Sequence, residues 1–269
     1  MQTANQPQYI AFFDSGLGGL NTLKEALTQM PGASFIYYGD TANVPYGPKK
    51  DEEVRDLMVS ALEFLSPYGL KALVIACNTG TCAAGAYLRD AYELPIIGME
   101  PAIKPAVEDV GDSGGRVLLL ATALTIKSAK LARLKALVDP NGIVDDLPCP
   151  ELVELAESLN FDQDAAAGLL KMKLVDRDPC KYGAVVLGST HYGYFRPAVE
   201  KLFPTRTKII DGNAGTVRHL MNLVSYDDIV QSPSSGRILL HLTDATDQKK
   251  IALSKSLLEE TSGLSVEIV

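Results

Sequence analysis

The sequence has few cysteines, few basic residues and no long apolar run. Its four cysteines are spread over 269 residues without CxxC spacing, which is too sparse for a disulfide scaffold. Lysine and arginine total 25 against 33 aspartates and glutamates, and this net charge of −8 argues against a broad nucleic-acid or anionic-membrane surface. Even the uncharged stretch 72–88 is interrupted by Asn78, Thr79 and Thr81, which argues against a membrane-spanning helix. A small-molecule ligand is the partner that these absences favour.

The composition is that of a chain with a sizeable core. Apolar residues make up 46% and charged residues 22%, which argues against disorder. At about 150 residues per domain, the length favours two domains. The N-terminal MQTANQPQ lacks a charged-then-apolar signal, so we expect a cytoplasmic protein.

Apolar runs alternate with amphipathic helical segments along the first third of the chain. Strands are expected at 9–13, 35–38 and 72–76, followed by the loops DSGLGG, GDTANVPYGP and CNTGT. Such alternation predicts an α/β fold, in which ligands bind at the carboxyl ends of parallel strands. We therefore expect Asp14, Tyr46 and Cys77 to converge.

A second set of strands and helices begins after Pro95. Strands are expected at 117–120, 184–187, 238–242 and 264–268, and helices at 151–158, at 162–174, after Asp211 and at 248–259. The prediction is two pseudo-symmetric, doubly wound parallel-sheet domains, formed by residues 1–97 with 210–269 and by residues 98–209.

A short internal echo supports the pseudo-symmetry. VIACNT at 74–79 resembles VLGSTH at 186–191, since each joins an apolar strand to a small nucleophile-type side chain and then to polar residues. We expect two related half-sites that face each other across a cleft.

Several familiar site motifs are missing. Gly16-Leu17-Gly18-Gly19 fails the G-x-G-x-x-G test, because position 21 is Asn, and the anionic Asp14 would repel a pyrophosphate there. There is no P-loop sequence and no H-E-x-x-H pair, so neither nucleotide nor metal chemistry is expected.

Two short segments carry reactive side chains. Cys77 precedes Asn78-Thr79, which favour helix N-caps, and a helix N-terminus can lower a thiol pKa from about 8.5. Cys77 is then a base or nucleophile, or else a buried cysteine that packs as a small hydrophobe; the other three cysteines are expected only to pack. Ser189-Thr190-His191 is either a histidine-activated serine or a polar helix cap, and it lacks a G-x-S-x-G elbow.

Eight segments together resemble the cofactor-independent glutamate racemases of the aspartate/glutamate racemase superfamily. They are FFDSGLGGL (12–20), YYGDTANVPYGPK (37–49), ALVIACNTGT (72–81), PIIGMEPAIKPAV (95–107), ATALTIKS (121–128), CPELVELAES (149–158), VVLGSTHYGYF (185–195) and IIDGNAG (209–215).

The resemblance implies an active site between two α/β domains, two thiols on opposite faces of the substrate α-carbon, no cofactor, and a homodimer. By position, Cys77 is the first catalytic thiol, Asp14 its polar neighbour, and Glu157 with His191 the pair that supports the second half-site. The residues implied to contact the substrate are Ser15, Pro45, Tyr46, Gly47, Asn78, Thr79, Thr125 and Thr190. Inversion by proton transfer needs an acid and a base on opposite faces, which suits two half-sites. The implied product is D-glutamate for peptidoglycan.

The main departure from the family pattern is Ser189, which stands where the second cysteine is expected. Gly193 also replaces the proline of a THYP pattern, and Asn43-Val44 replace an Arg-Cys pair. A hydroxyl is a poorer base than a thiol and needs a neighbour such as His191 to take its proton. Three explanations stay open: an engineered change, a natural racemase that uses Ser189 with His191, or chemistry that needs one thiol. The first two explanations give a slow or one-sided glutamate racemase, and the third gives a single-thiol isomerase or lyase of another small carboxylate. A non-catalytic binder of acidic amino acids is a further alternative.

Overall fold

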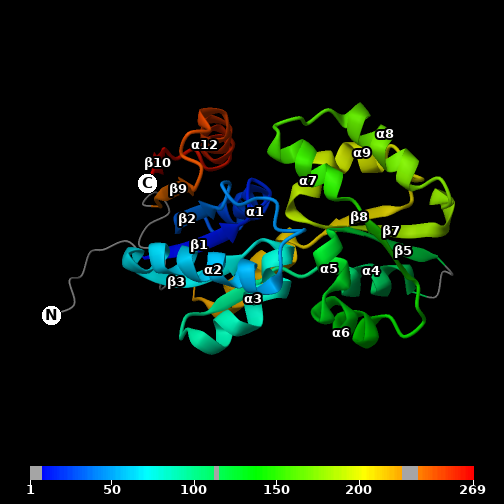
Figure 1. Cartoon of the computed structure of the whole chain (residues 1–269), viewed down its shortest axis with the longest axis horizontal. Coiled ribbons are helices and arrows are strands. Elements are labelled where there is room, and N and C mark those ends of the chain that lie inside the picture. Colours follow the sequence, from blue (N-terminus) through cyan, green and yellow to red (C-terminus); the bar gives the residue numbers. More distant parts are fainter. Residues whose placement is uncertain (1–7, 112–114, 226–235) are drawn as a thin grey trace. The chain divides into compact units, whose positions relative to one another are not determined.

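The computed structural model describes residues 8–111, 115–225 and 236–269, and the chain forms two compact units (Figure 1). The first unit comprises Met1–Tyr46, Lys50–Met99 and Asn213–Val269, and the second comprises Gly47–Lys49 and Glu100–Gly212. The assignment of residues 1–97 with 210–269 to one domain and of residues 98–209 to the other stays a prediction.

The described part of the first unit is built on a parallel sheet of six strands. These are β1 (Tyr9–Asp14), β2 (Ser34–Gly39), β3 (Leu70–Ile75), β4 (Ile96–Gly98), β9 (Ile238–Leu242) and β10 (Val266–Ile268), in the order β10-β9-β2-β1-β3-β4. The register pairs Asp14 with Gly39 and Phe13 with Ile75. The carboxyl ends of β1, β2 and β3 therefore lie side by side.

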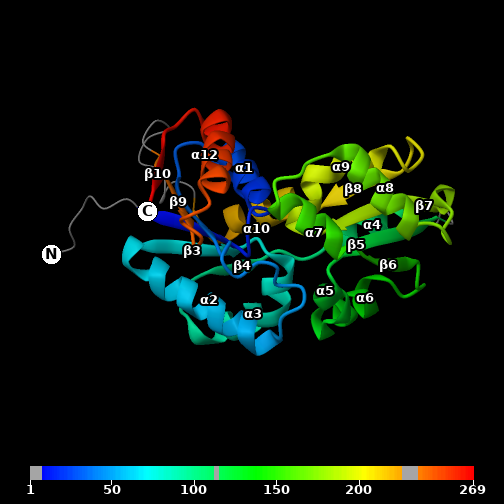
Figure 2. The same ribbon diagram turned by 45° about the horizontal axis from the view of Figure 1, so that its top comes forward.

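Helices cover both faces of this sheet (Figure 2). They are α1 (Leu20–Gln29), α2 (Asp51–Leu65), α3 (Asn78–Ala91), α10 (Asn213–Leu223) and α12 (Gln248–Ser262). Alternate residues of β1, such as Ala11 and Phe13, pack in one core with Met58 of α2 and Leu88 of α3. The intervening Ile10 and Phe12 are also fully buried, so the strand reads as a continuous apolar run.

The second unit contains a parallel sheet with the order β6-β5-β7-β8. Its strands are β5 (Arg116–Ala121), β6 (Val144–Pro148), β7 (Tyr182–Gly188) and β8 (Lys208–Asp211), and its helices are α4 (Ile103–Val110), α5 (Ala123–Lys127), α6 (Ala129–Val138), α7 (Pro150–Glu157), α8 (Gln163–Lys173) and α9 (Arg196–Glu200). Alternate positions of β5 serve two cores, since Leu118 packs with Leu152 of α7 whereas Val117 packs with Ile103 of α4.

The sequence-based expectation of an α/β fold with parallel sheets is confirmed. The strands expected from apolar runs are present as β1, β2, β3, β5, β7, β9 and β10, with shifts of a few residues at their ends. Three strands, β4, β6 and β8, were not expected. No helix among the described residues is long and apolar enough to cross a membrane.

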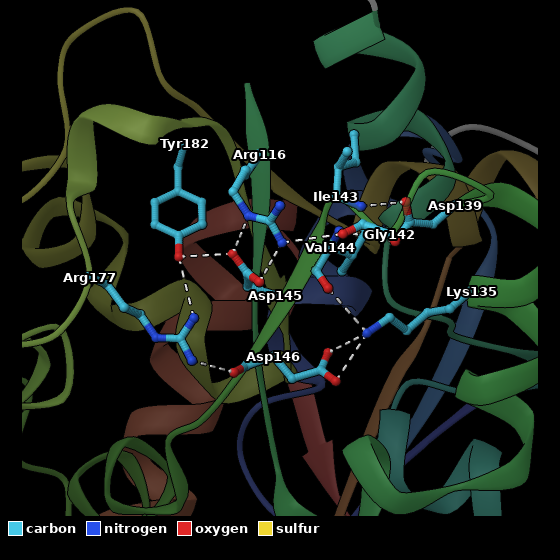
Figure 3. Close-up of polar contacts among 10 residues, drawn as sticks. All are labelled: Arg116, Lys135, Asp139, Gly142, Ile143, Val144, Asp145, Asp146, Arg177 and Tyr182. Carbon is cyan, nitrogen blue, oxygen red and sulfur yellow. Dashed lines mark hydrogen bonds and ion pairs between the residues drawn. The ribbon is translucent and has the colours of Figure 1, made fainter. Parts of the chain in front are cut away.

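The acidic sequence of β6 explains why this strand was missed. Asp145 and Asp146 have low strand propensity, but each has a cationic partner (Figure 3). Arg116 holds Asp145 with two hydrogen bonds of 2.6 Å, and the Lys135 ammonium lies 3.0 Å from an Asp146 oxygen. Pairing in the folded chain thus offsets an unfavourable local sequence.

The two sheets share one strand order. The order β2-β1-β3-β4 within the first sheet matches the order β6-β5-β7-β8 of the second. In both, the strand that comes first in the sequence lies between the second and the third, and the fourth lies beyond the third. The direction of winding therefore reverses between β1 and β3 in the first unit, and between β5 and β7 in the second. In open α/β sheets, such a switch point is where ligands bind, beyond the carboxyl ends of the strands.

Candidate active site

Asp14 ends β1 at the switch point of the first unit and is fully buried. Its Oδ1 accepts a hydrogen bond of 3.0 Å from the Gly16 N–H. A Cβ at Gly19 would lie 2.6 Å from the Asp14 Cβ, so only glycine lets the start of α1 approach this side chain so closely. The glycine loop thus holds a carboxylate in place.

Cys77 lies across the switch point from Asp14, directly before α3. The position of its sulfur is fixed by the Gly80 N–H, which donates to Sγ over 3.3 Å, and the thiol donates to the Ser15 hydroxyl over 3.5 Å. Cys77 is itself the N-cap residue of α3. The expectation that Asn78 or Thr79 caps this helix is therefore wrong, because both already lie within it.

The expected lowering of the Cys77 pKa is also wrong. Burial raises the pKa of this thiol to about 12, and the nearby Asp14 carboxylate adds to the rise, while hydrogen bonds from Gly80 and with Ser15 oppose it. Desolvation of a fully buried sulfur outweighs the helix N-terminus here. Cys77 is therefore a thiol, not a thiolate, in the unliganded protein at neutral pH.

Asn78 brings an unsatisfied polar atom beside this thiol. Its amide nitrogen donates to the Met99 sulfur over 3.4 Å, while its buried Oδ1 has no hydrogen-bond partner among the described residues. Such orphaned atoms are costly unless a ligand or water satisfies them. Asn78 thus offers an acceptor to a small donor, such as an ammonium group. Thr79, the next residue, is buried as well.

Tyr46 lies in the loop that follows β2 and belongs to the first unit, as Asp14 and Cys77 do. The Tyr46 hydroxyl donates to Asp40 Oδ2 over 2.5 Å, and its ring belongs to the core that contains Cys77. Burial, followed by the Asp40 charge, raises the Tyr46 pKa far above its usual value, which keeps the hydroxyl protonated. The expected convergence of Asp14, Tyr46 and Cys77 is thus observed at the first sheet.

Two residues that organise this loop were missed in the sequence. Asp40 Oδ1 also accepts from Asn43 and from the Thr243 hydroxyl, each over 2.9 Å. Asp40 stands within the quoted motif at 37–49, but Thr243 follows β9 and is 203 residues away in the chain. Adjacent strands, β2 and β9, bring the two together, and no local pattern signals that pairing.

Pro45 and Gly47, the residues on either side of Tyr46, differ in exposure and belong to different units. Pro45 is exposed and follows a cis peptide bond, and Gly47 is the first residue of the short segment that groups with the second unit. A Cβ on Gly47 would lie 3.5 Å from the Thr122 Cβ, an ordinary contact. Space alone therefore does not require glycine there.

The second unit presents hydroxyls and a histidine at its own switch point. Thr122 caps α5 by accepting from the Thr125 N–H over 3.3 Å, and its hydroxyl donates to that of Thr125 over 3.0 Å. Ser189 follows β7 at the N-cap position of a short 3-10 helix (Thr190–Phe195), which its side chain does not cap. Ser189 and Thr190 are both nearly buried.

His191 and Glu157 meet in this unit, as the resemblance implied. The His191 Nε2 lies 2.7 Å from Glu157 Oε1, and only 3% and 9% of the two side chains are exposed. A charge-assisted contact between nearly buried groups fixes the orientation of the imidazole. Tyr192 anchors the same turn, because its hydroxyl donates to the Cys149 carbonyl over 2.9 Å.

Of the other three cysteines, Cys149 and Cys82 are placed as expected for packing residues, whereas that expectation is wrong for the exposed Cys180. Cys149 is buried in a core of the second unit, Cys82 is half-buried on α3, and Cys180 is exposed; all four cysteines of the chain are free thiols.

Known proteins resemble this chain over most of its length. The model of the Asp/Glu/Hydantoin racemase family matches residues 14–220. The chain is 46% identical over 252 residues to a glutamate racemase of Halothermothrix orenii, covering 93% of this chain and 99% of the relative. It is 41% identical to glutamate racemase 2 of Bacillus subtilis, covering 93% and 95%.

Solved structures show the same fold. Glutamate racemase isoform RacE1 from Bacillus anthracis superposes with a TM-score of 0.83 at 26% identity, covering 98% of this chain and 97% of that one. The Francisella tularensis glutamate racemase in complex with D-glutamate gives 0.79 at 27% identity, covering 98% of both chains. With a family model that spans most of the chain and relatives above 40% identity over nearly their full length, this protein belongs to the Asp/Glu racemase family.

Proposed function

We propose that this protein interconverts L- and D-glutamate by removing the α-proton from one face and returning a proton to the other. The observation that carries the proposal is the buried Cys77 thiol, held beside Asp14 and Ser15 at a switch point, in a chain whose relatives are glutamate racemases. The family resemblance implies that no cofactor takes part and that the D-glutamate supplies peptidoglycan synthesis. It also favours a cytoplasmic enzyme, and the four free thiols fit such a reducing compartment.

The first half-site suits the ammonium end of an amino acid. The buried Asn78 Oδ1 needs a donor, and the Asp14 carboxylate lies close enough to Cys77 to raise its pKa. A bound ammonium group would satisfy the amide oxygen and offset the carboxylate. The same positive charge would lower the pKa of the thiol, because an adjacent cation favours the thiolate. Substrate binding thus prepares Cys77 to act as a base.

The second half-site comprises Ser189, Thr190 and the His191–Glu157 pair. We propose that Ser189 exchanges a proton with the opposite face of the α-carbon and that His191, oriented by Glu157, supports this exchange. An alkoxide is far less accessible than a thiolate, so this proton transfer is expected to limit turnover. In the opposite direction, the resting Cys77 thiol already carries the proton that it must donate.

Slow proton transfer at Ser189 cannot make the two directions unequal in kcat/KM. L- and D-glutamate have the same free energy in water, so their equilibrium constant is one and the two kcat/KM values must match. A weak second half-site instead lowers both values together. It also lets Cys77 exchange the α-proton of one enantiomer with solvent without inversion.

The test is a racemisation assay by circular dichroism, started separately from L- and D-glutamate. We expect optical activity to decay from both sides to the racemate, with equal kcat/KM and no added cofactor. The assay is repeated with L-aspartate, arylmalonates and hydantoins. Turnover of one of these with inert glutamate would contradict the proposal and would favour a single-thiol isomerase or lyase. Glutamate binding without any turnover would favour a non-catalytic protein; the comparisons favour neither alternative.

A further inference from the structure

A basic pocket in the second unit lies apart from the residues discussed so far. It has a volume of about 640 Å³, within the range of small-molecule sites. Four cationic side chains line it, Arg116, Lys181, Arg206 and Lys208, against one lining acid, Asp109. In a chain of net charge −8, such a local excess of positive charge needs an explanation.

Two of the four cations already have carboxylate partners. The Arg116 guanidinium is held by Asp145 through two hydrogen bonds of 2.6 Å (Figure 3), and Lys208 pairs with Asp109. Asp145 also accepts from the Tyr182 hydroxyl over 3.1 Å, which fixes the carboxylate behind the arginine. These pairs make a preorganised wall with little net charge.

The other two cations have no carboxylate partner among the described residues. Arg206 donates to the backbone carbonyl of Cys180 over 3.0 Å, and Lys181 makes no ion pair there. That contact ties the Arg206 guanidinium to the backbone of the residue before Lys181 without neutralising its charge, and both side chains line the pocket. Two positive charges are thus presented to the pocket uncompensated.

We propose that this pocket binds a small molecule that carries a diphosphate group. A diphosphate carries two or more negative charges, which matches the uncompensated Lys181 and Arg206. Planar guanidinium groups bind phosphate oxygens in a bidentate manner, and lysine adds a point charge. The pocket volume leaves room for an organic group on the phosphates, as in a nucleoside diphosphate.

The pocket lies at the amino-terminal ends of the strands, whereas the candidate catalytic residues follow their carboxyl ends. Arg116 begins β5 and Tyr182 begins β7, whereas Thr122 and Ser189 follow the other ends of these strands. These strands have six and seven residues, and at about 3.3 Å per residue their two ends are roughly 20 Å apart. A diphosphate bound here does not compete with glutamate.

The experiment is isothermal titration calorimetry of the full chain with pyrophosphate and with ADP, at low ionic strength and without divalent cations. The test variant is Lys181→Gln/Arg206→Gln. The matched control is Lys104→Gln/Lys201→Gln, which removes the same charge from two exposed lysines of the second unit outside the pocket. We expect binding to one site, weakened at least about tenfold in the test variant and less than about twofold in the control.

Cys180 provides a second readout, because its exposed side chain lines the pocket. ADP should slow the alkylation of Cys180 by N-ethylmaleimide, followed by peptide mass spectrometry, and leave the half-buried Cys82 unaffected. Tighter binding of ADP than of pyrophosphate supports an organic diphosphate, and the reverse supports the inorganic ion. No binding by the wild type at millimolar ligand, equal losses in both double variants, or no protection of Cys180 would each overturn the proposal. None of these readouts depends on racemisation.

Discussion

Cys77 and Ser189 each follow the third strand of their sheet in chain order, yet their surroundings differ. Cys77 caps a 14-residue α-helix with its own sulfur, whereas Ser189 precedes a six-residue 3-10 helix that its side chain does not cap. The neighbours of Cys77 are a carboxylate and a hydroxyl, whereas Ser189 is followed two residues later in the chain by His191, which pairs with Glu157. One topology thus places Cys77 and Ser189 in chemically unequal surroundings.

The removal of the Cys77 thiol should give the largest effect. In Cys77→Ala we expect kcat/KM for racemisation to fall roughly a thousandfold or more from both enantiomers, because no other group can exchange the α-proton on that face. The matched control is Cys82→Ala, a half-buried cysteine on the same helix α3. Circular dichroism assays of both variants check this, and comparable activity in the two would rule out Cys77 as the acid/base.

Ser189→Cys tests whether the second half-site is limited only by its hydroxyl. A thiol has a pKa of about 8.5 and is a much better base than a serine hydroxyl. We expect kcat/KM to rise roughly tenfold or more, equally in both directions. An unchanged or lower rate would mean that the rest of this half-site does not support proton transfer.

The contact between Glu157 and His191 predicts a smaller loss. Glu157→Gln keeps a hydrogen-bonding group but removes the charge that supports the imidazole, so we expect about a tenfold lower kcat/KM. Glu154→Gln, one turn earlier on α7 and exposed, is the matched control. If the two variants have the same steady-state kinetics, the pair has no role in turnover.

The smallest effect concerns stability at alkaline pH. Burial raises the pKa of both Cys77 and Cys149 to about 12 in the folded chain, whereas the unfolded value is about 8.5. Between about pH 8.5 and 10 the unfolded chain loses these protons first, so the free energy of unfolding falls as pH rises. The expected slope is about 1.4 kcal/mol per pH unit for each buried thiol.

Urea titrations at several pH values check this slope. Cys77→Ala or Cys149→Ala should remove one thiol's share of it, whatever the variant costs in absolute stability. Cys180→Ala, an exposed thiol, is the control. If the slope were the same in all three variants and the wild type, the burial of these sulfurs would not govern their titration.

Much of the fold was predictable because buried parallel strands are continuous apolar runs. The strands at 9–14 and 182–188 are examples, and the loops that follow them hold Asp14 and Ser189. The acidic β6 was not predictable, since its aspartates are stabilised by Arg116 and Lys135, whose contacts exist only in the folded chain.

Within the candidate site, residue identity was easier to predict than chemistry. The motifs pointed to Cys77 and to the Glu157–His191 pair, but not to Thr243, which reaches Asp40 only through the pairing of β2 with β9. The direction of the Cys77 pKa shift was wrong because a helix start can be read from sequence, whereas the depth of burial depends on packing.

The most direct test of the account is α-proton exchange in deuterated water, started separately from L- and D-glutamate, with the wild type and Ser189→Ala. We predict that the wild type incorporates deuterium from both enantiomers with inversion. Ser189→Ala should exchange the α-proton of one enantiomer only, without inversion, because Cys77 still serves its own face. If Ser189→Ala still inverts glutamate at the wild-type rate, or if the wild type exchanges neither enantiomer, the assignment of two unequal half-sites is wrong.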